Sequence, residues 1–217
     1  LQELAGTLAE EARTASGRTD ARIAGCLSPH GWSYRPELAP PFDELWPHYA
    51  EVAQLQAPHV DLILCETMGS IEEGRAAARG AAEAGLPVWL AWSVLDDDTA
   101  RLRSGEPVAD AVAAVDDLGV EAILLNCSTP EAITAALPFL ADAGLAFGAY
   151  ANGFSHIVEE YQQGSTVDEL GTRPDLDPAS YLETVSGWID LGATIVGGCC
   201  EIGPAHIRAI ADRLGAT

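Results

Sequence analysis

The sequence contains no lysine, because all 11 of its basic residues are arginine. Schiff-base catalysis needs a lysine amine, so pyridoxal-phosphate enzymes and lysine-dependent aldolases are excluded. The lysine of a Walker-type phosphate-binding loop is missing as well, which excludes that class of nucleotide-binding protein.

Positive charge and long apolar runs are both scarce. Eleven basic residues stand against 33 acidic ones, for a formal net charge of −22. Such a chain repels phosphate backbones and anionic lipid, which argues against nucleic acid or a membrane surface as the partner. No apolar run approaches the roughly 20 residues that span a bilayer. We expect small neutral or cationic ligands.

The five cysteines are an odd number and two of them are adjacent, which does not suit the disulfide framework of a small secreted protein. Cytoplasmic thiols, reactive or metal-bound, are the better interpretation. The 217 residues, 48% of them hydrophobic, predict a single folded domain over 1–217. Residues 1–12 read as the middle of an amphipathic helix without an N-cap, so we expect the chain to lack upstream residues.

Short β-branched apolar runs alternate with alanine-rich helical stretches, as in repeated βα units around a parallel sheet. The strands expected from the sequence cover 22–26, 60–65, 87–92, 122–126, 146–150 and 193–196. The expected helices cover 42–56, 71–84, 107–118, 130–143, 178–191 and 204–214. The longest irregular stretch, 152–177, is expected to be a loop over the functional site.

Most of these helices are followed by glycine and then almost at once by the next strand. Short αβ turns of this kind are typical of (β/α)8 TIM barrels, in which the opposite βα loops carry the function. About six βα units are present, so we expect a barrel that lacks its first two units. An open doubly wound sheet is the alternative, but no GxGxxG follows the first strand.

In a barrel, the residues just past the strands hold the active site. Both asparagines of the chain, Asn126 and Asn152, and three of the five cysteines fall there. These strand ends are 26–28, 66–67, 93, 126–128, 152–153 and 197–200.

Cys127 and the adjacent pair Cys199 and Cys200 place three thiols at the ends of different strands. Three thiolates suit Zn²⁺, and three protein ligands leave the fourth tetrahedral position open, as in catalytic zinc sites. Gly197 and Gly198 would let the backbone turn so that both adjacent cysteines face one ion. Buried cysteine is often a small hydrophobe, the favoured interpretation for Cys26 and Cys65.

The strand ends Leu-Leu-Asn126-Cys127, Ile-Val-Gly197-Gly198-Cys199-Cys200 and Leu-Cys-Glu66-Thr67 resemble those of the homocysteine S-methyltransferases. This family shares a zinc-containing (β/α)8 barrel with betaine–homocysteine methyltransferase and with the homocysteine domain of cobalamin-dependent methionine synthase. The resemblance implies Cys127, Cys199 and Cys200 as zinc ligands. It also implies that Glu66 binds the amino group of homocysteine.

We extend the substrate-binding set to Thr67 and Asn152, which share those strand ends. The family begins with a strand ending in Asp-Gly-Gly and a second βα unit, and neither is present in this sequence. The cofactor that the resemblance implies is Zn²⁺, and the partners are homocysteine and a small methyl donor. The oligomeric state is open, a homo-oligomer included.

The implied reaction is methyl transfer to the homocysteine thiol, which gives methionine. Zinc would lower the pKa of that thiol, so no general base is required, and His30 and His156 are expected in loops rather than at strand ends. A sulfonium such as S-methylmethionine is the favoured donor, with betaine second, because no cobalamin or folate module is present. Five aromatic residues near the βα loops could face a cationic donor or could equally pack in the core or in a lid: Trp32, Tyr34, Trp46, Trp92 and Phe154.

Two other functions stay open. A metal-free TIM-barrel lyase or isomerase could bind phosphate at Gly197 and Gly198, because barrels often bind phosphate after their last strands. A non-catalytic, zinc-binding barrel fragment would keep the thiols but expose unpaired strand edges.

Overall fold

The computed structural model describes residues 1–115, 117–155 and 170–215. In these residues, six strands form one sheet in the order β1 to β6, and each strand is parallel to its neighbours. A doubly wound sheet reverses its strand order at a switch point, and this sheet does not. The order therefore confirms the expected barrel class and the count of about six units.

The strands are β1 (Ala24–Leu27), β2 (Leu62–Met68), β3 (Val88–Trp92), β4 (Ala122–Asn126), β5 (Ala146–Tyr150) and β6 (Ile195–Val196). The α-helices are α1 (Gln2–Ser16), α2 (Phe42–Gln56), α3 (Ile71–Ala82), α4 (Val108–Ala113), α5 (Pro130–Ala136), α6 (Pro138–Ala141), α7 (Pro178–Asp190) and α8 (Pro204–Leu214). Two short 3-10 helices are η1 (Pro36–Leu38) and η2 (Ala57–His59).

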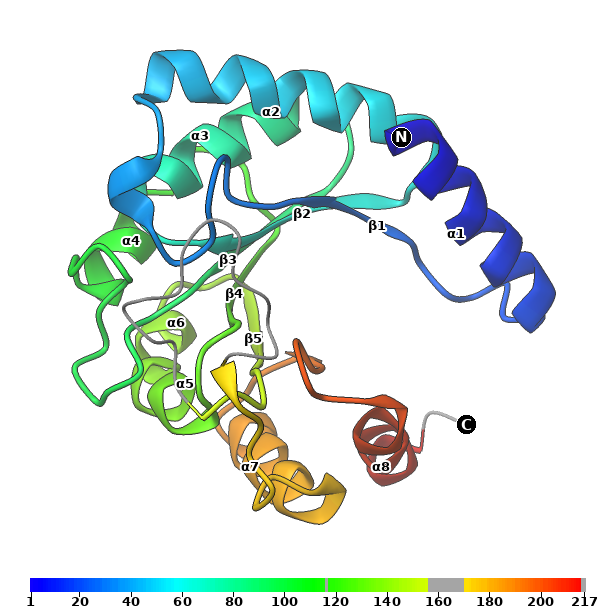
Figure 1. Cartoon of the computed structure of the whole chain (residues 1–217), viewed down its shortest axis with the longest axis vertical. Helices are drawn as coiled ribbons and strands as arrows, with labels where there is room; N and C mark the ends of the chain where they lie inside the picture. Colours follow the sequence, from blue (N-terminus) through cyan, green and yellow to red (C-terminus); the bar gives the residue numbers. More distant parts are fainter. Residues whose placement is uncertain (116, 156–169, 216–217) are drawn as a thin grey trace.

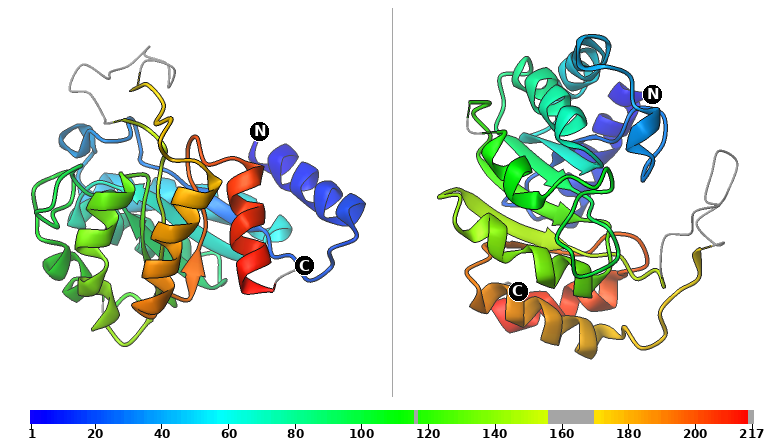
Figure 2. Two further views of the ribbon diagram at one scale, coloured as in Figure 1. Left: turned by 90° about the horizontal axis from the view of Figure 1, so that it is seen from below. Right: turned by 90° about the vertical axis from the view of Figure 1, so that its left-hand side faces the viewer.

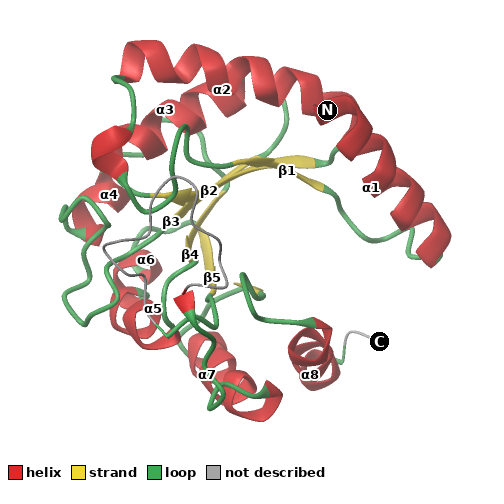
Figure 3. Cartoon of the chain, in the orientation of Figure 1, coloured by secondary structure: helices red, strands yellow, loops and turns green. Residues whose placement is uncertain are grey.

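The helices lie on the convex side of a curved sheet, with α1 and α8 at the two ends of the arc (Figure 1). The colouring by secondary structure shows the strands inside this ring of helices (Figure 3). Helices α5, α7 and α8 run side by side along one flank (Figure 2). Among the described strands, β1 pairs only with β2 and β6 only with β5, so the sheet curls like a barrel wall that stays open between its first and last strands.

The main core lies between the sheet and the helices. Side chains such as Ile63, Leu90 and Ile123 point from the strands toward fully buried helical residues, Ala77 and Trp188 among them. A smaller apolar cluster covers the concave face of the sheet. Its members are Ala91, Ala122 and Leu124, with the half-buried Leu64, Trp89, Tyr150 and Ile195 against them.

Several expected elements differ from the structure. The first strand is Ala24–Leu27 instead of 22–26, so Cys26 lies inside β1. The second strand runs to Met68 instead of ending at 65, so Glu66 and Thr67 lie inside β2. The helix expected over 107–118 ends at Ala113. The helix expected over 130–143 is interrupted before Pro138, because proline cannot donate the intrahelical hydrogen bond. The last strand is only Ile195–Val196 instead of 193–196.

The loops at the carboxyl ends of the strands include backbone that non-glycine residues rarely adopt. Tyr34, Thr67 and Cys127 have φ values of 69°, 65° and 46°. Such conformations are unfavourable and persist where surrounding contacts hold them, and they gather at functional sites. All three residues lie at or after the carboxyl end of a strand, which is the functional end of a barrel.

Candidate metal centre

The thiols of Cys127, Cys199 and Cys200 meet at the carboxyl end of the sheet. Their Sγ atoms all lie within 4.8 Å of one another. The Sγ atoms of Cys199 and Cys127 are 3.1 Å apart, those of Cys127 and Cys200 are 3.8 Å apart, and those of Cys199 and Cys200 are 3.9 Å apart. Cys127 follows β4 and is buried, and the other two follow β6 and are half-buried.

This spacing fits a tetrahedral zinc ion. Zinc–sulfur bonds of about 2.3 Å at tetrahedral angles put ligand sulfurs roughly 3.8 Å apart. The contacts of Cys200 with Cys127 and with Cys199 already have that length, and the 3.1 Å contact between Cys199 and Cys127 would have to open by less than 1 Å. The donor set therefore suits zinc, in both chemistry and geometry.

The three thiols differ in their pKa values. Hydrogen bonds from Cys127 and then from Cys199 stabilise the thiolate of Cys200 and lower its pKa to about 3. The pKa of Cys199 is raised, first by its hydrogen bond with Cys127, then by that with Cys200, and by burial. For Cys127, the hydrogen bond from Cys199 lowers the pKa, but Cys200 and burial outweigh it and raise the pKa to about 11. One thiolate thus forms readily, as a first metal ligand must.

Backbone hydrogen bonds position the two cysteine loops against β5. The N–H of Cys199 donates to the carbonyl of Ala151 at 2.9 Å, and the N–H of Gly153 donates to the carbonyl of Cys200 at 2.9 Å. Gly198 is required here, because a Cβ on it would lie 2.2 Å from Ile202 Cγ2. The Gly-Gly pair thus lets the chain turn tightly enough to bring both thiols to Cys127.

Glu66 lies on the concave face of β2 and is half-buried. Its Oε1 accepts a hydrogen bond from Cys26 Sγ at 2.8 Å, and its Oε2 accepts one from the Tyr150 hydroxyl at 3.0 Å. Burial and then the charge of Glu66 raise the pKa values of Cys26 and of Tyr150, so both stay protonated donors near neutral pH. The carboxylate is therefore held in place from β1 and from β5.

A cavity of about 340 Å³ lies over Glu66 on the concave face. Tyr150 and the carboxyl end of β6, Gly197 and Gly198 included, line it together with Glu66. It continues over the apolar side chains Leu64, Trp89, Leu124, Ile195 and Val196. A carboxylate beside an apolar wall suits a small molecule that carries a cationic amine and an apolar portion.

The other predicted substrate residues, Thr67 and Asn152, are both buried. Asn126 holds Thr67 from two sides: its Oδ1 accepts from the Thr67 N–H at 2.8 Å, and its Nδ2 donates to the Thr67 hydroxyl at 2.9 Å. Asn152 Oδ1 accepts from the N–H of Phe154 at 3.2 Å, whereas its Nδ2 has no hydrogen-bond partner among the described residues. Asn152 thus retains a donor for a ligand.

The aromatic candidates are divided between site and core. Tyr34 reaches the metal centre, with its hydroxyl 2.9 Å from Cys127 Sγ. Trp92 is buried in the core between sheet and helices, and Trp46 of α2 packs against that core under the guanidinium of Arg79, so the core alternative holds for these two. Phe154 is buried, and Trp32 is half-buried.

Of the two histidines expected in loops, the structure describes only His30. His30 lies in the loop after β1 and packs edge-on against His48, with 4.3 Å between ring centroids. His156 lies outside the described residues, as does much of the loop expected over 152–177.

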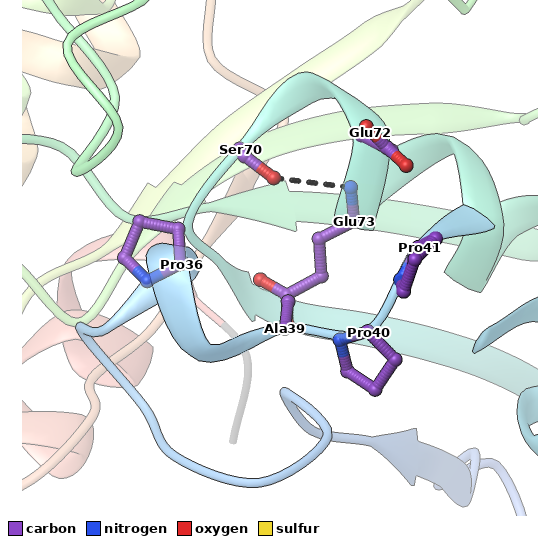
Figure 4. Close-up of a pocket in the computed structure, with 7 residues that line it drawn as sticks. All are labelled: Pro36, Ala39, Pro40, Pro41, Ser70, Glu72 and Glu73. Atoms are coloured by element: carbon purple, nitrogen blue, oxygen red, sulfur yellow. Dashed lines mark hydrogen bonds between the residues drawn. The ribbon is translucent and has the colours of Figure 1, made fainter. Parts of the chain in front are cut away.

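A second cavity, of about 360 Å³, lies between the loops that follow β1 and β2 (Figure 4). It is lined by Pro36, Ala39, Pro40, Pro41, Ser70, Glu72 and Glu73. Its two carboxylates already accept hydrogen bonds from backbone, since Glu72 accepts from the N–H of Phe42 and Glu73 from that of Gly69. None of its lining residues belongs to the cysteine cluster.

The family follows from a match along almost the whole chain. Residues 1–214 match the sequence profile described as "Homocysteine S-methyltransferase". The chain belongs to the homocysteine S-methyltransferase family. It is 29% identical over 170 residues to "Homocysteine S-methyltransferase 4" of Zea mays, an alignment that covers 76% of this chain and 47% of the maize protein. The chain thus spans about half the length of that curated relative.

Solved structures support the fold of this family member. The apo form of the homocysteine methyltransferase MmuM from Escherichia coli matches with a TM-score of 0.74 at 24% identity, covering 98% of this chain and 73% of that chain. The metallated form of the same protein matches with a TM-score of 0.73 at 24% identity, covering 95% and 67%. The chain therefore has the fold of that protein over about 70% of the solved chain.

Sequence reasoning about this homocysteine S-methyltransferase family member missed two residues around Glu66 and Cys127. Tyr150 is the last residue of β5, and its hydroxyl donates a hydrogen bond to Glu66. Because side chains alternate along a strand, its position two residues after Gly148 could have placed it on the concave face. Arg103 lies over the ring of Tyr34, with Cζ 5.2 Å from its centroid, and no sequence pattern pointed to it. No helix among the described residues is long and apolar enough to cross a membrane.

Proposed function

We propose that this chain binds Zn²⁺ through Cys127, Cys199 and Cys200 and transfers a methyl group from a sulfonium donor to the thiol of homocysteine. The observation that carries the proposal is the convergence of three thiols from two strand ends at zinc-ligand spacing. Family membership supports the substrate class. The metal-free phosphate-binding alternative loses support, because the cavity at Gly197 and Gly198 contains the carboxylate of Glu66 and no arginine.

The residues around the cavity suit an amino acid substrate. The carboxylate of Glu66 would accept hydrogen bonds from the ammonium group of homocysteine, as the family resemblance implies, and Tyr150 and Cys26 hold that carboxylate in place. Asn152 is buried and does not line this cavity, and its Nδ2, which has no partner among the described residues, is the donor we propose for the substrate carboxylate. Thr67 lies next to Glu66, and its two hydrogen bonds with Asn126 hold the carboxyl end of β2 in place.

Cys127, Cys199 and Cys200 would hold the zinc ion, which when bound would lower the pKa of the substrate thiol. The homocysteine sulfur then forms a bond to the methyl carbon while the carbon–sulfur bond of the donor breaks. The donor leaves as a neutral thioether, and the thiol proton passes to solvent. With S-methylmethionine, both products are methionine.

The test is zinc content together with methionine formation. Protein purified under reducing conditions is expected to contain close to one zinc per chain by elemental analysis, and to form methionine from homocysteine and S-methylmethionine. Cys127→Ser, Cys199→Ser and Cys200→Ser should each lose the zinc and the activity. Cys26→Ser is the matched control for zinc content, because Cys26 is a thiol of the same concave face that lies outside the cluster.

Each other outcome has a distinct meaning. Absence of zinc from folded wild-type protein would refute the metal centre. Zinc at one per chain without methionine formation, whether from S-methylmethionine or from betaine, would identify this chain as a zinc-binding barrel without catalysis.

A further inference from the structure

Arg103 forms a buried ion pair directly behind the metal centre. It lies in the loop after β3, and its Nη1 and Nη2 atoms are each 3.1 Å from an oxygen of Asp96. The side chains of Arg103 and Asp96 are only 7% and 13% exposed. Arg103 Nε donates to Ser93 Oγ at 3.0 Å, so all three guanidinium nitrogens already have acceptors.

The guanidinium of Arg103 also lies over the ring of Tyr34. The Cζ atom of Arg103 lies 5.2 Å from the centroid of the Tyr34 ring, within the range of a cation–π contact. Tyr34 itself is in the loop after β1, has φ of 69°, and holds its hydroxyl 2.9 Å from Cys127 Sγ. Once Cys127 is a thiolate it can only accept, so Tyr34 is the donor of that hydrogen bond.

The same ion pair also braces the loop that carries Cys127. Asp96 Oδ1 accepts a hydrogen bond from the N–H of Thr129 at 3.1 Å. Ser93, the partner of Arg103 Nε, donates to the carbonyl of Cys127 at 3.3 Å. Cys127 has φ of 46°, a conformation that surrounding contacts must maintain. Arg103 therefore contacts Tyr34 directly and reaches Cys127 through Ser93, while Asp96 holds Thr129 of the same loop.

We propose that Arg103, anchored by Asp96, is a positioning residue that sets the hydroxyl of Tyr34 against the Cys127 thiolate and so tunes that thiolate as a metal ligand. The inference rests on the proposed function, since it assumes that Cys127 binds zinc. Hydrogen bonds to ligand atoms from neighbouring residues commonly change metal affinity by about 10- to 100-fold.

The test is a double-mutant cycle read out by metal binding. Tyr34→Phe removes the hydroxyl and keeps the ring. Arg103→Lys keeps a positive charge opposite Asp96 and loses the guanidinium that lies over Tyr34. Zinc affinity, measured by competition with a chelator, is expected to fall by roughly 10-fold in each variant. The double variant should lose no more zinc affinity than the single variant with the larger loss, because both substitutions act through one hydrogen bond.

A second readout follows the thiolate itself. In the Co²⁺-substituted protein, loss of a hydrogen bond raises the energy of the sulfur lone pairs, so the thiolate-to-metal charge-transfer band should move to longer wavelength in both variants. Arg101→Lys is the matched control, because Arg101 is an exposed arginine of the same loop, and it should leave both the affinity and the band unchanged.

Three results would overturn the inference: wild-type zinc affinity in Tyr34→Phe, losses that multiply in the double variant, or a band that does not move. If Arg103→Lys fails to fold, Arg103→Gln combined with Asp96→Asn takes its place in the cycle, because it removes both charges together. Absence of metal from the wild-type protein would instead refute the proposed function, so the two failures are distinguishable.

Discussion

At the scale of single residues, Glu66 shows how a charged group can be kept ready for a ligand. Its two oxygens accept hydrogen bonds from Cys26 of the neighbouring strand β1 and from Tyr150 of the more distant strand β5. No arginine pairs with this carboxylate in the described part of the chain, so its negative charge remains available. A cationic amine in the cavity would supply the missing partner.

We predict that Glu66→Gln weakens homocysteine binding while zinc is retained. Hydrogen bonds to charged groups contribute about 1.5–3 kcal/mol, which corresponds to roughly a 10- to 150-fold rise in KM for homocysteine. Steady-state kinetics and elemental analysis on the same samples check this. Glu72→Gln, which changes a carboxylate of the second cavity, is the control and should keep the wild-type KM. An unchanged KM in Glu66→Gln would remove Glu66 from the binding site.

At the scale of secondary structure, the metal centre depends on how the short strand β6 attaches to β5. Gly148 of β5 faces Ile195 of β6, and a Cβ on Gly148 would lie 1.8 Å from the Ile195 carbonyl oxygen. Tyr181 of helix α7 also links the two segments. Its hydroxyl donates to the Gly197 carbonyl at 2.7 Å and accepts from the N–H of Ala151 at 3.1 Å. Both contacts support the loop that carries Cys199 and Cys200.

Gly148→Ala is therefore expected to separate β6 from β5 and to release the zinc. Overpacking of a tight site commonly destabilises a fold by about 1–3 kcal/mol. Denaturant unfolding and zinc content measure the two effects. Gly187→Ala is the matched control: a Cβ there has nothing within 4 Å, and alanine in a helix should stabilise by about 0.5–1 kcal/mol. Wild-type zinc retention by Gly148→Ala would contradict the role of this close approach.

At the scale of the whole molecule, the dominant feature is a net charge of −22 on 217 residues. Most ion pairs in the described residues have an exposed partner, and such pairs contribute little stability. The pair of Arg103 and Asp96 is the exception, because both of its side chains are largely buried. Repulsion among the surplus carboxylates should therefore outweigh attraction at the surface and oppose the compact state.

Salt should accordingly stabilise this protein. Raising NaCl from about 0.02 to about 0.5 M shortens the Debye length from roughly 20 Å to about 4 Å and screens the repulsion, so the thermal midpoint at pH 7 should rise. The rise should shrink near pH 5, which is closer to the sequence pI of 4.2. Differential scanning calorimetry measures both. A midpoint that falls with salt at pH 7 would show that attractive surface pairs dominate instead.

The sequence by itself determined the alternation of strands and helices, the parallel barrel class and the placement of three thiols at strand ends. These follow from local patterns, because apolar runs and glycine turns act over a few residues. It also suggested the roles of Cys127, Cys199, Cys200 and Glu66, which stay predictions until zinc and substrate are measured.

Only the tertiary structure decided which side chains meet. The curl of the sheet brings Cys127 to the cysteines 72 and 73 residues further along the chain, and it places Tyr150 at Glu66. The loop after β1 folds back to set Tyr34 between Cys127 and Arg103. No local pattern encodes these contacts, because they depend on the twist of the sheet and on packing between segments distant in the sequence.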